Sequence, residues 1–188
     1  MKTFVLAAAL LALAAACRRP GTPSPPKADG SAAGVTMIDY RPADGAYGCR
    51  APARWRTDEE SAWGPAVTFL DPDGPRPYSH SISILRYPGK ADSFTSAAQY
   101  LKEAGPEGAD AGPVVKTTED GLTLYRYHET KPFRSLNGRT VLYQLRDDVV
   151  LLPVKGGFYR LTHSAPDGEY LTTLPVFEAL VKSFRPKG

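Results

Sequence analysis

The stretch TVLYQLRDDVVLLPVKGGFYRLTHS, residues 140–164, decides the fold class of this chain. Its apolar segments are separated by Asp147-Asp148 and by Lys155-Gly156-Gly157. Acidic pairs and glycine pairs between apolar runs are typical of tight turns. Because strands joined by such short connections must be antiparallel neighbours, the stretch predicts an antiparallel meander. The three strands expected in it are residues 140–146, 149–154 and 158–164.

Further strands precede this meander. In residues 78–88, His80, Ile82 and Ile84 alternate with serines, which is the period of a half-buried strand. Asp120-Gly121 is a hairpin signal between two more strands. The other strands expected from such patterns are residues 47–52, 67–70, 114–117 and 122–128.

Two helices complete the pattern. Ser93 is a suitable N-cap for the first, and Gly105-Pro106 stop it. Its apolar residues recur at helical spacing: Phe94, Ala97, Ala98, Leu101 and Ala104. The second has Thr172 or Thr173 as its cap and Pro175 in its first turn. Its expected buried stripe is Phe177, Leu180, Val181 and Phe184. Runs of strands with helices on the sheet faces predict a single α+β domain, mainly an antiparallel sheet flanked by helices.

The N-terminus has the form of a secretion signal. Residues 1–16, MKTFVLAAALLALAAA, hold one lysine and then an apolar run that is too short to span a membrane before Arg18. The segment LAAAC, ending at Cys17, resembles the lipobox of bacterial lipoproteins, which predicts that Cys17 is acylated and the signal peptide removed. The alternative is ordinary signal-peptidase cleavage after Ala14 or Ala16.

Residues 17–39 are expected to form the lipidated cysteine and a disordered spacer rich in Pro, Gly and Ala, and residues 40–186 the domain. By the same resemblance, Arg18 stands where lipoproteins retained in the inner membrane often carry aspartate. We therefore expect a lipid-anchored protein of the cell envelope, on the outer membrane facing the periplasm if the cell has two membranes.

Composition excludes several classes of protein. The chain has 188 residues, 42% of them hydrophobic, and a formal net charge of +3 with scattered cations, which gives no basis for nucleic-acid binding. It has two cysteines, Cys17 and Cys49. If Cys17 is acylated, no disulfide can form within the domain, and Cys49 is expected to be a small core residue.

The domain resembles the PsbP/Mog1 family. Pro52-Ala53-Arg54-Trp55 is similar to the P-x-x-W that closes the family's first hairpin. Residues 157–166, GFYRLTHSAP, and the closing helix from Pro175 to Phe184 are similar to the family's last strand and last helix. The resemblance covers about Tyr40 to Pro186 and implies α/β/α layers. The family includes photosystem accessory proteins, partner-binding proteins and bacterial lipoproteins, with no shared catalytic residues to transfer.

Catalytic and metal-binding motifs are missing from the sequence. We therefore expect no enzyme activity, no cofactor and no metal site. The alternative is a metal-binding or enzymatic domain that uses His80, His128 or His163. In the expected meander, His128 and His163 end strands of opposite direction and so lie near opposite ends of the sheet, which argues against a shared site.

Because no catalytic or metal-binding motif is found, the function expected for the domain is binding. We expect a membrane-tethered accessory lipoprotein that binds an unknown envelope protein, and the alternative is a periplasmic carrier of a small ligand. Loops on a rigid sheet commonly carry binding, so residues 105–113 and 129–137 are candidate contact elements. Tyr125, Tyr127 and Phe133 are candidate contact residues if they are exposed, although both tyrosines could instead lie beneath a helix.

Acylation can be tested directly. Stable attachment needs more than one acyl chain, at about 0.8 kcal/mol per buried methylene group. We expect Cys17→Ser to move the protein from the membrane to the soluble fraction, measured by fractionation of lysed cells. A wild-type protein that is already soluble would contradict the prediction.

Overall fold

The computed structural model describes residues 34–59, 66–74, 80–90, 94–106, 111–135 and 138–187. Cys17, the predicted signal peptide and the predicted spacer as far as residue 33 lie outside these ranges. Residues 37–39, which were also expected in the spacer, lie in a strand, β1 Met37–Tyr40. Two sheets and two helices are found in the described part, and they confirm the predicted α+β class.

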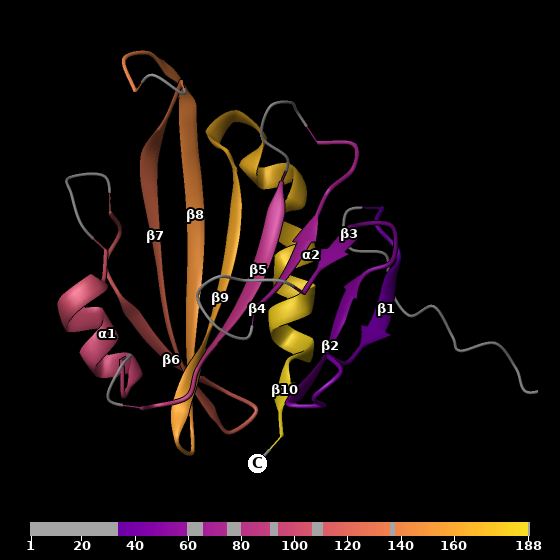
Figure 1. Cartoon of the computed structure of the whole chain (residues 1–188), viewed down its shortest axis with the longest axis vertical. Helices are drawn as coiled ribbons and strands as arrows, with labels where there is room; N and C mark the ends of the chain where they lie inside the picture. The colour runs from indigo at the N-terminus through magenta and orange to yellow at the C-terminus, as the bar shows by residue number, and fades with distance from the viewer. Residues whose placement is uncertain are drawn as a thin grey trace, which may run out of the picture.

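The larger sheet is antiparallel throughout and has the strand order β3-β4-β5-β9-β8-β7-β6 (Figure 1). Its strands are β3 Arg56–Asp58, β4 Ala66–Leu70, β5 Ser81–Tyr87, β6 Val115–Glu119, β7 Leu122–Arg134, β8 Val141–Val154 and β9 Gly157–Pro166. A smaller sheet has the order β1-β2-β10, from β1 Met37–Tyr40, β2 Tyr47–Pro52 and β10 Arg185–Pro186.

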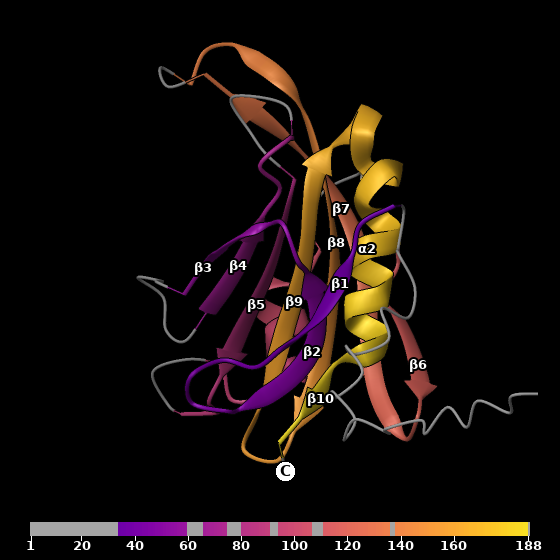
Figure 2. The ribbon, with the colours of Figure 1, turned by 90° about the vertical axis from the view of Figure 1, so that its right-hand side faces the viewer.

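The two helices lie on opposite faces of the larger sheet. Helix α2, Tyr170–Ser183, runs along one face beside β1 and β2 (Figure 2), after a short 3-10 helix η1, Asp167–Glu169. Helix α1, Ala97–Ala104, covers part of the other face. Each helix closes a hydrophobic core, so the sheet forms the middle layer.

The larger core lies between the sheet, α2 and the small sheet. Phe69, Ile82, Phe177 and Phe184 are among its fully buried side chains, and Cys49 is buried there as predicted. The smaller core lies under α1, where Tyr100 packs against Phe158 of β9.

Helix starts differ from the sequence predictions. The predicted cap Ser93 lies outside the described residues, and the N-cap of α1 is Ser96, whose hydroxyl accepts a hydrogen bond from the Gln99 amide at 3.1 Å. Helix α2 begins at Tyr170, before Thr172 and Thr173, so Pro175 lies inside the helix rather than in its first turn. The 3-10 helix η1 leads directly into this earlier start.

The prediction of a turn at Asp147-Asp148 is wrong. Both residues lie inside β8, which continues without a break from Val141 to Val154. A strand tolerates two buried carboxylates here because both are paired. Lys131 and Ser164 bind Asp147, and Arg126 binds Asp148. The alternation of apolar residues on either side could not reveal these distant partners.

Strand β7 is also longer than predicted. Residues 129–134 were expected in a loop, but they pair with β8, from Glu129 opposite Asp147 to Arg134 opposite Val141, with a bulge between Phe133 and Arg134. The turn that precedes β7 is as predicted. Asp120 and Gly121 have φ values of 49° and 78°, which suit a tight hairpin.

Two glycines follow each other where the chain passes from β8 to β9: Gly156 lies in the turn and Gly157 is the first residue of β9. Of the two, only Gly157 has no room for a side chain. Gly157 has a φ of 144°, and a Cβ there would overlap the carbonyl oxygen of Tyr87. Gly156 has a φ of 77°, but a Cβ there would meet nothing within 4 Å.

We expect Gly157→Ala to lower the free energy of unfolding by about 2–4 kcal/mol, because it adds a backbone overlap to an unfavourable φ. The matched variant Gly156→Ala carries only the left-handed penalty of about 1 kcal/mol. Urea unfolding of both variants measures the difference. Equal losses would mean that the contact with Tyr87 does not matter.

Candidate functional site

Polar residues form a row across three neighbouring strands of the larger sheet, β9, β8 and β7. Asp148 of β8 lies opposite His128 of β7 on one side and His163 of β9 on the other. Side chains of directly paired residues point to the same face, which here is the α2 face. The prediction that His128 and His163 lie near opposite ends of the sheet is therefore wrong. Its error came from breaking β8 into two strands.

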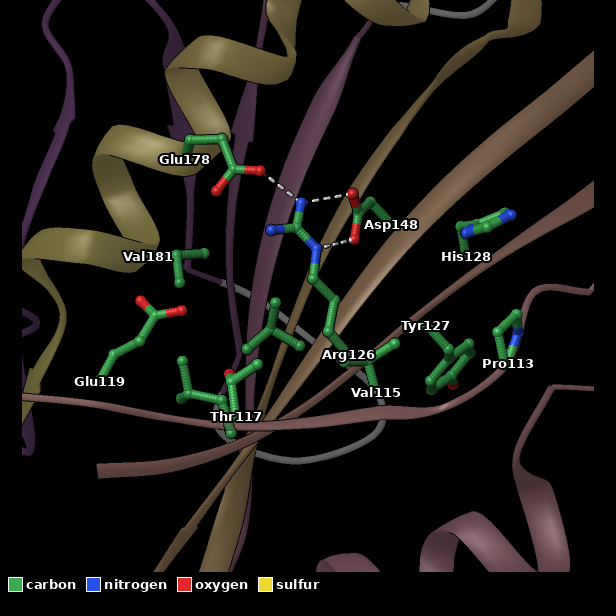
Figure 3. Close-up of a pocket in the computed structure, with 12 residues that line it drawn as sticks. Pro113, Val115, Thr117, Glu119, Arg126, Tyr127, His128, Asp148, Glu178 and Val181 are labelled. Carbon is green, nitrogen blue, oxygen red and sulfur yellow. Dashed lines mark hydrogen bonds and ion pairs between the residues drawn. The ribbon is translucent and has the colours of Figure 1, made fainter. Parts of the chain in front are cut away.

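Arg126 occupies the centre of the site. Its Nε donates to Asp148 Oδ1 at 2.8 Å, and its Nη2 donates to Asp148 Oδ2 at 2.6 Å and to Glu178 Oε1 at 2.5 Å (Figure 3). The Tyr170 hydroxyl also donates to Asp148 Oδ2, at 2.7 Å. One guanidinium thus joins β7, β8 and α2 through a charge-assisted fork.

The pKa values in this cluster follow from its contacts. Burial alone would lower the pKa of Arg126, but the hydrogen bonds to Asp148 and Glu178 outweigh it and raise that pKa. Burial, followed by the hydrogen bond to Asp148, raises the pKa of the Tyr170 hydroxyl. Both groups therefore stay protonated at any physiological pH, and neither is suited to proton transfer.

A cavity of about 300 Å³ opens beside Arg126, between β6, β7 and α2. We call it the β6–α2 groove. Its apolar lining comes from Val115, Leu124, Val150 and Val181. Its charged lining consists of Glu119, Asp148 and Glu178 with the cation Arg126, and the imidazole of His128 also lines it. The groove therefore combines an apolar floor with an excess of carboxylates.

Strand β6 forms the outer wall of the groove. It is the last strand of the larger sheet, and in the described part of the chain only β7 pairs with it. Figure 3 shows Thr117 and Glu119 on the groove side. Val115 at the start of the strand is 51% exposed. The strand thus presents an open hydrogen-bonding edge next to the groove.

His163 lies in the core rather than in the groove. It is fully buried, its Nε2 lies 2.8 Å from Thr173 Oγ1, and its ring stacks on Phe177. Burial lowers its pKa to about 4. His80 is buried elsewhere, with Nδ1 3.0 Å from Asp71 and Nε2 3.2 Å from Glu169.

No group of three or more His, Cys, Asp or Glu side chains able to hold a metal occurs among the residues that the structure describes. The thiol of Cys49 is no nucleophile at neutral pH, because burial raises its pKa to about 12. No helix in the same described ranges has the length and apolar character to cross a bilayer.

The predicted contact residues separate into different surroundings. Tyr127 is buried beneath α1, which settles the alternative left open by the sequence. Tyr125 is half-buried, with the Lys116 ammonium 5.8 Å from its ring centre. Phe133 lies far along β7 and stacks on Tyr143 at 4.8 Å. The three do not form one surface, and Cys17 lies outside the described residues.

Sequence reasoning did not identify Arg126, Asp148 and Glu178 as partners. A signal was present for Arg126, which shares the buried face of its strand with Leu122 and Leu124. A cation on such a face requires a carboxylate partner. Nothing in the sequence could show that Glu178, 52 residues away, would supply one.

No protein-family profile and no curated protein matches the chain. Similar solved structures exist. One is a protein of Bacteroides thetaiotaomicron, with 14% identity and a TM-score of 0.52, covering 80% of this chain and 48% of the other. The chain thus spans about half the length of that protein.

Two others are matched over most of their length. LpqN of Mycobacterium tuberculosis, involved in cell envelope biogenesis, has 18% identity and a TM-score of 0.50, covering 82% of this chain and 92% of LpqN. The Ran-binding protein Mog1p of Saccharomyces cerevisiae has 9% identity and a TM-score of 0.50, covering 81% and 96%. These likenesses confirm the predicted PsbP/Mog1-like fold.

The burial of neutral His163 generates a pH prediction. Its pKa is lower in the folded than in the unfolded chain, so the unfolded chain binds the extra proton first. The free energy of unfolding should therefore fall as pH drops from about 6.5 to about 4, by at most about 3 kcal/mol from this residue. We expect His163→Phe to remove this part of the slope in urea unfolding measured across that range.

The matched variant Thr173→Val removes the hydroxyl partner but keeps the imidazole. It should retain the slope even if its stability falls at every pH. A wild-type slope in His163→Phe would show that other groups cause the acid sensitivity.

Proposed function

We propose that this chain is a lipid-anchored, non-catalytic accessory protein of the cell envelope that binds another protein at the β6–α2 groove. The observation that carries the proposal is the open edge of β6 beside a groove that is both apolar and acidic. This combination suits the binding of an extended peptide segment better than it suits catalysis.

The edge of β6 supplies the main-chain part of recognition. A segment that adds to β6 as a further strand would form backbone hydrogen bonds along residues 115–119. Its alternate side chains would then point to the groove side of the sheet. Val115 and Thr117, two residues apart along β6, both line the groove and can contact such side chains.

Charge supplies the selectivity. Glu119 is exposed and has no ion pair within the described part of the chain, while one carboxylate oxygen of Glu178 binds Arg126. Arg126 is already held by two carboxylates and has little left to offer an anion. The partner segment is therefore expected to carry a lysine or arginine that reaches Glu119.

The polar chemistry of the site supports binding rather than catalysis. The carboxylate of Asp148 is occupied by Arg126 and Tyr170 and is only 6% exposed. Cys49 is a buried thiol on the core side of β2. Neither group is positioned to activate a nucleophile in the groove.

The envelope location is supported by the lipobox-like segment ending at Cys17 and by the spacer after it. The fold shared with LpqN, a protein of cell envelope biogenesis, is in keeping with that location. Outer-membrane placement is part of the same proposal, because Arg18 follows the cysteine.

A small-ligand carrier is the second candidate. The groove volume of about 300 Å³ lies at the lower end of the range for small-molecule pockets. Its carboxylates would then select a small cationic ligand. Such a ligand would need no strand edge, which is why we favour the peptide.

A photo-crosslinking residue at Thr117 tests the proposal in intact cell envelopes. We expect one reproducible protein neighbour by mass spectrometry, absent when the same probe replaces Leu171, which is 74% exposed on α2. Adding Glu119→Lys to the Thr117 probe should lower the yield about tenfold, as reversal of one close charge pair would. The control Asp39→Lys, an exposed residue of β1, should leave it unchanged.

The same yield from both probe positions would contradict a specific groove partner. A small cation that purifies with the protein and is lost in Glu119→Lys, with no protein neighbour at Thr117, would favour the carrier.

A further inference from the structure

Strands β7 and β8 extend well beyond the rest of the sheet. Strand β9 pairs with β8 only from Leu145 onward, and β6 pairs with β7 only as far as Arg126. Within the described ranges, residues 132–135 and 138–144 therefore pair only with each other. They form the top of the molecule in Figure 1 and bend away from the α2 face in Figure 2. We call these residues the projecting hairpin.

The projecting hairpin carries apolar and aromatic side chains where a solvated hairpin would carry polar ones. Val141 and Leu142 are 43% and 48% exposed. Behind them, Phe133 and Tyr143 stack with ring centres 4.8 Å apart and planes 18° apart. A two-stranded ribbon has little stability alone, so an apolar surface at its end favours a further contact.

The charged side chains in and next to the projecting hairpin are all cationic. From Thr130 to Arg146 the sequence has four cations and no carboxylate. Two of them belong to the body of the domain: Lys131 pairs with Asp147, and Arg146 lies over the Tyr170 ring at 4.3 Å. Arg134 and Arg139 are exposed near the end, on either side of the turn. Cations beside exposed apolar side chains match the headgroup and acyl regions of an anionic bilayer.

We propose that the projecting hairpin rests on an anionic lipid surface, with Val141 and Leu142 at the acyl boundary and Arg134 and Arg139 at the headgroup phosphates. Each cation near such a surface strengthens partitioning about fivefold, so two cations and two aliphatic side chains make a weak contact. A tether makes a weak contact effective by raising the local concentration.

The acyl chains proposed on Cys17 would supply that tether, so this inference rests on the proposed lipid anchor. The 16 residues between Cys17 and Gly34 reach about 50 Å when extended. The hairpin would then hold the domain in one orientation, rather than leave it free at the end of its spacer. The β6–α2 groove carries the opposite charge, so the two surfaces select different targets.

The test uses the mature protein with an environment-sensitive fluorophore on Leu142→Cys. Cys49 is buried and does not compete for the label. Cys17 does not compete either, because it is acylated or, in the tagged protein, replaced by serine. The protein is held on vesicles by its acyl chains or, if intact mass shows none, by an N-terminal histidine tag on a nickel-chelating lipid. The anchor and the hairpin are thus assessed separately. We expect a blue shift on phosphatidylglycerol–phosphatidylcholine vesicles that is lost on pure phosphatidylcholine.

Two comparisons make the result specific. The label on Leu171→Cys, which is equally apolar and more exposed, should not shift. Adding Arg134→Glu and Arg139→Glu to the labelled hairpin should weaken the lipid-dependent shift at least tenfold, while Lys187→Glu should not. No shift at Leu142, an equal shift at Leu171, or a shift insensitive to the two arginines would overturn the proposal. Any of these would leave the crosslinking result at Thr117 untouched.

Discussion

The contact between Arg126 and Asp148 is the constraint on which the arrangement of the sheet and α2 depends. A carboxylate that is only 6% exposed inside a strand is costly unless its oxygens are paired, and here both are. The same guanidinium reaches Glu178, and the same carboxylate accepts a bond from Tyr170 at the start of α2. The pair therefore fixes both where α2 begins and how it lies on the sheet.

This arrangement leaves the edge of the sheet at β6 uncovered by α2. Helix α2 is held over β8 and β9, with its residues Val176, Phe177 and Leu180 in the larger core. Strand β6 lies beyond its reach at the end of the sheet. The space between β6 and α2 is therefore a groove rather than core. Its acidic character follows from the two carboxylates that Arg126 needs, together with Glu119.

The fold was largely predictable, and the site was not. Periodicity of two located β2 and β5, a short apolar run located β4, and the Asp120-Gly121 signal located the β6–β7 hairpin. Asp147-Asp148 misled because an acidic pair between apolar runs has the composition of a turn. That one error hid the length of β8, the continuation of β7 to Arg134, and the alignment of His128 with His163.

By itself the sequence determined the class of fold and the burial of Cys49, because local periodicity and composition are sufficient for these. Only the tertiary structure decided which charges meet. Arg126, Asp148 and Glu178 come from three elements, and their pairing depends on strand register and helix position. Such long-range contacts form when the chain packs, so no local pattern in the sequence records them.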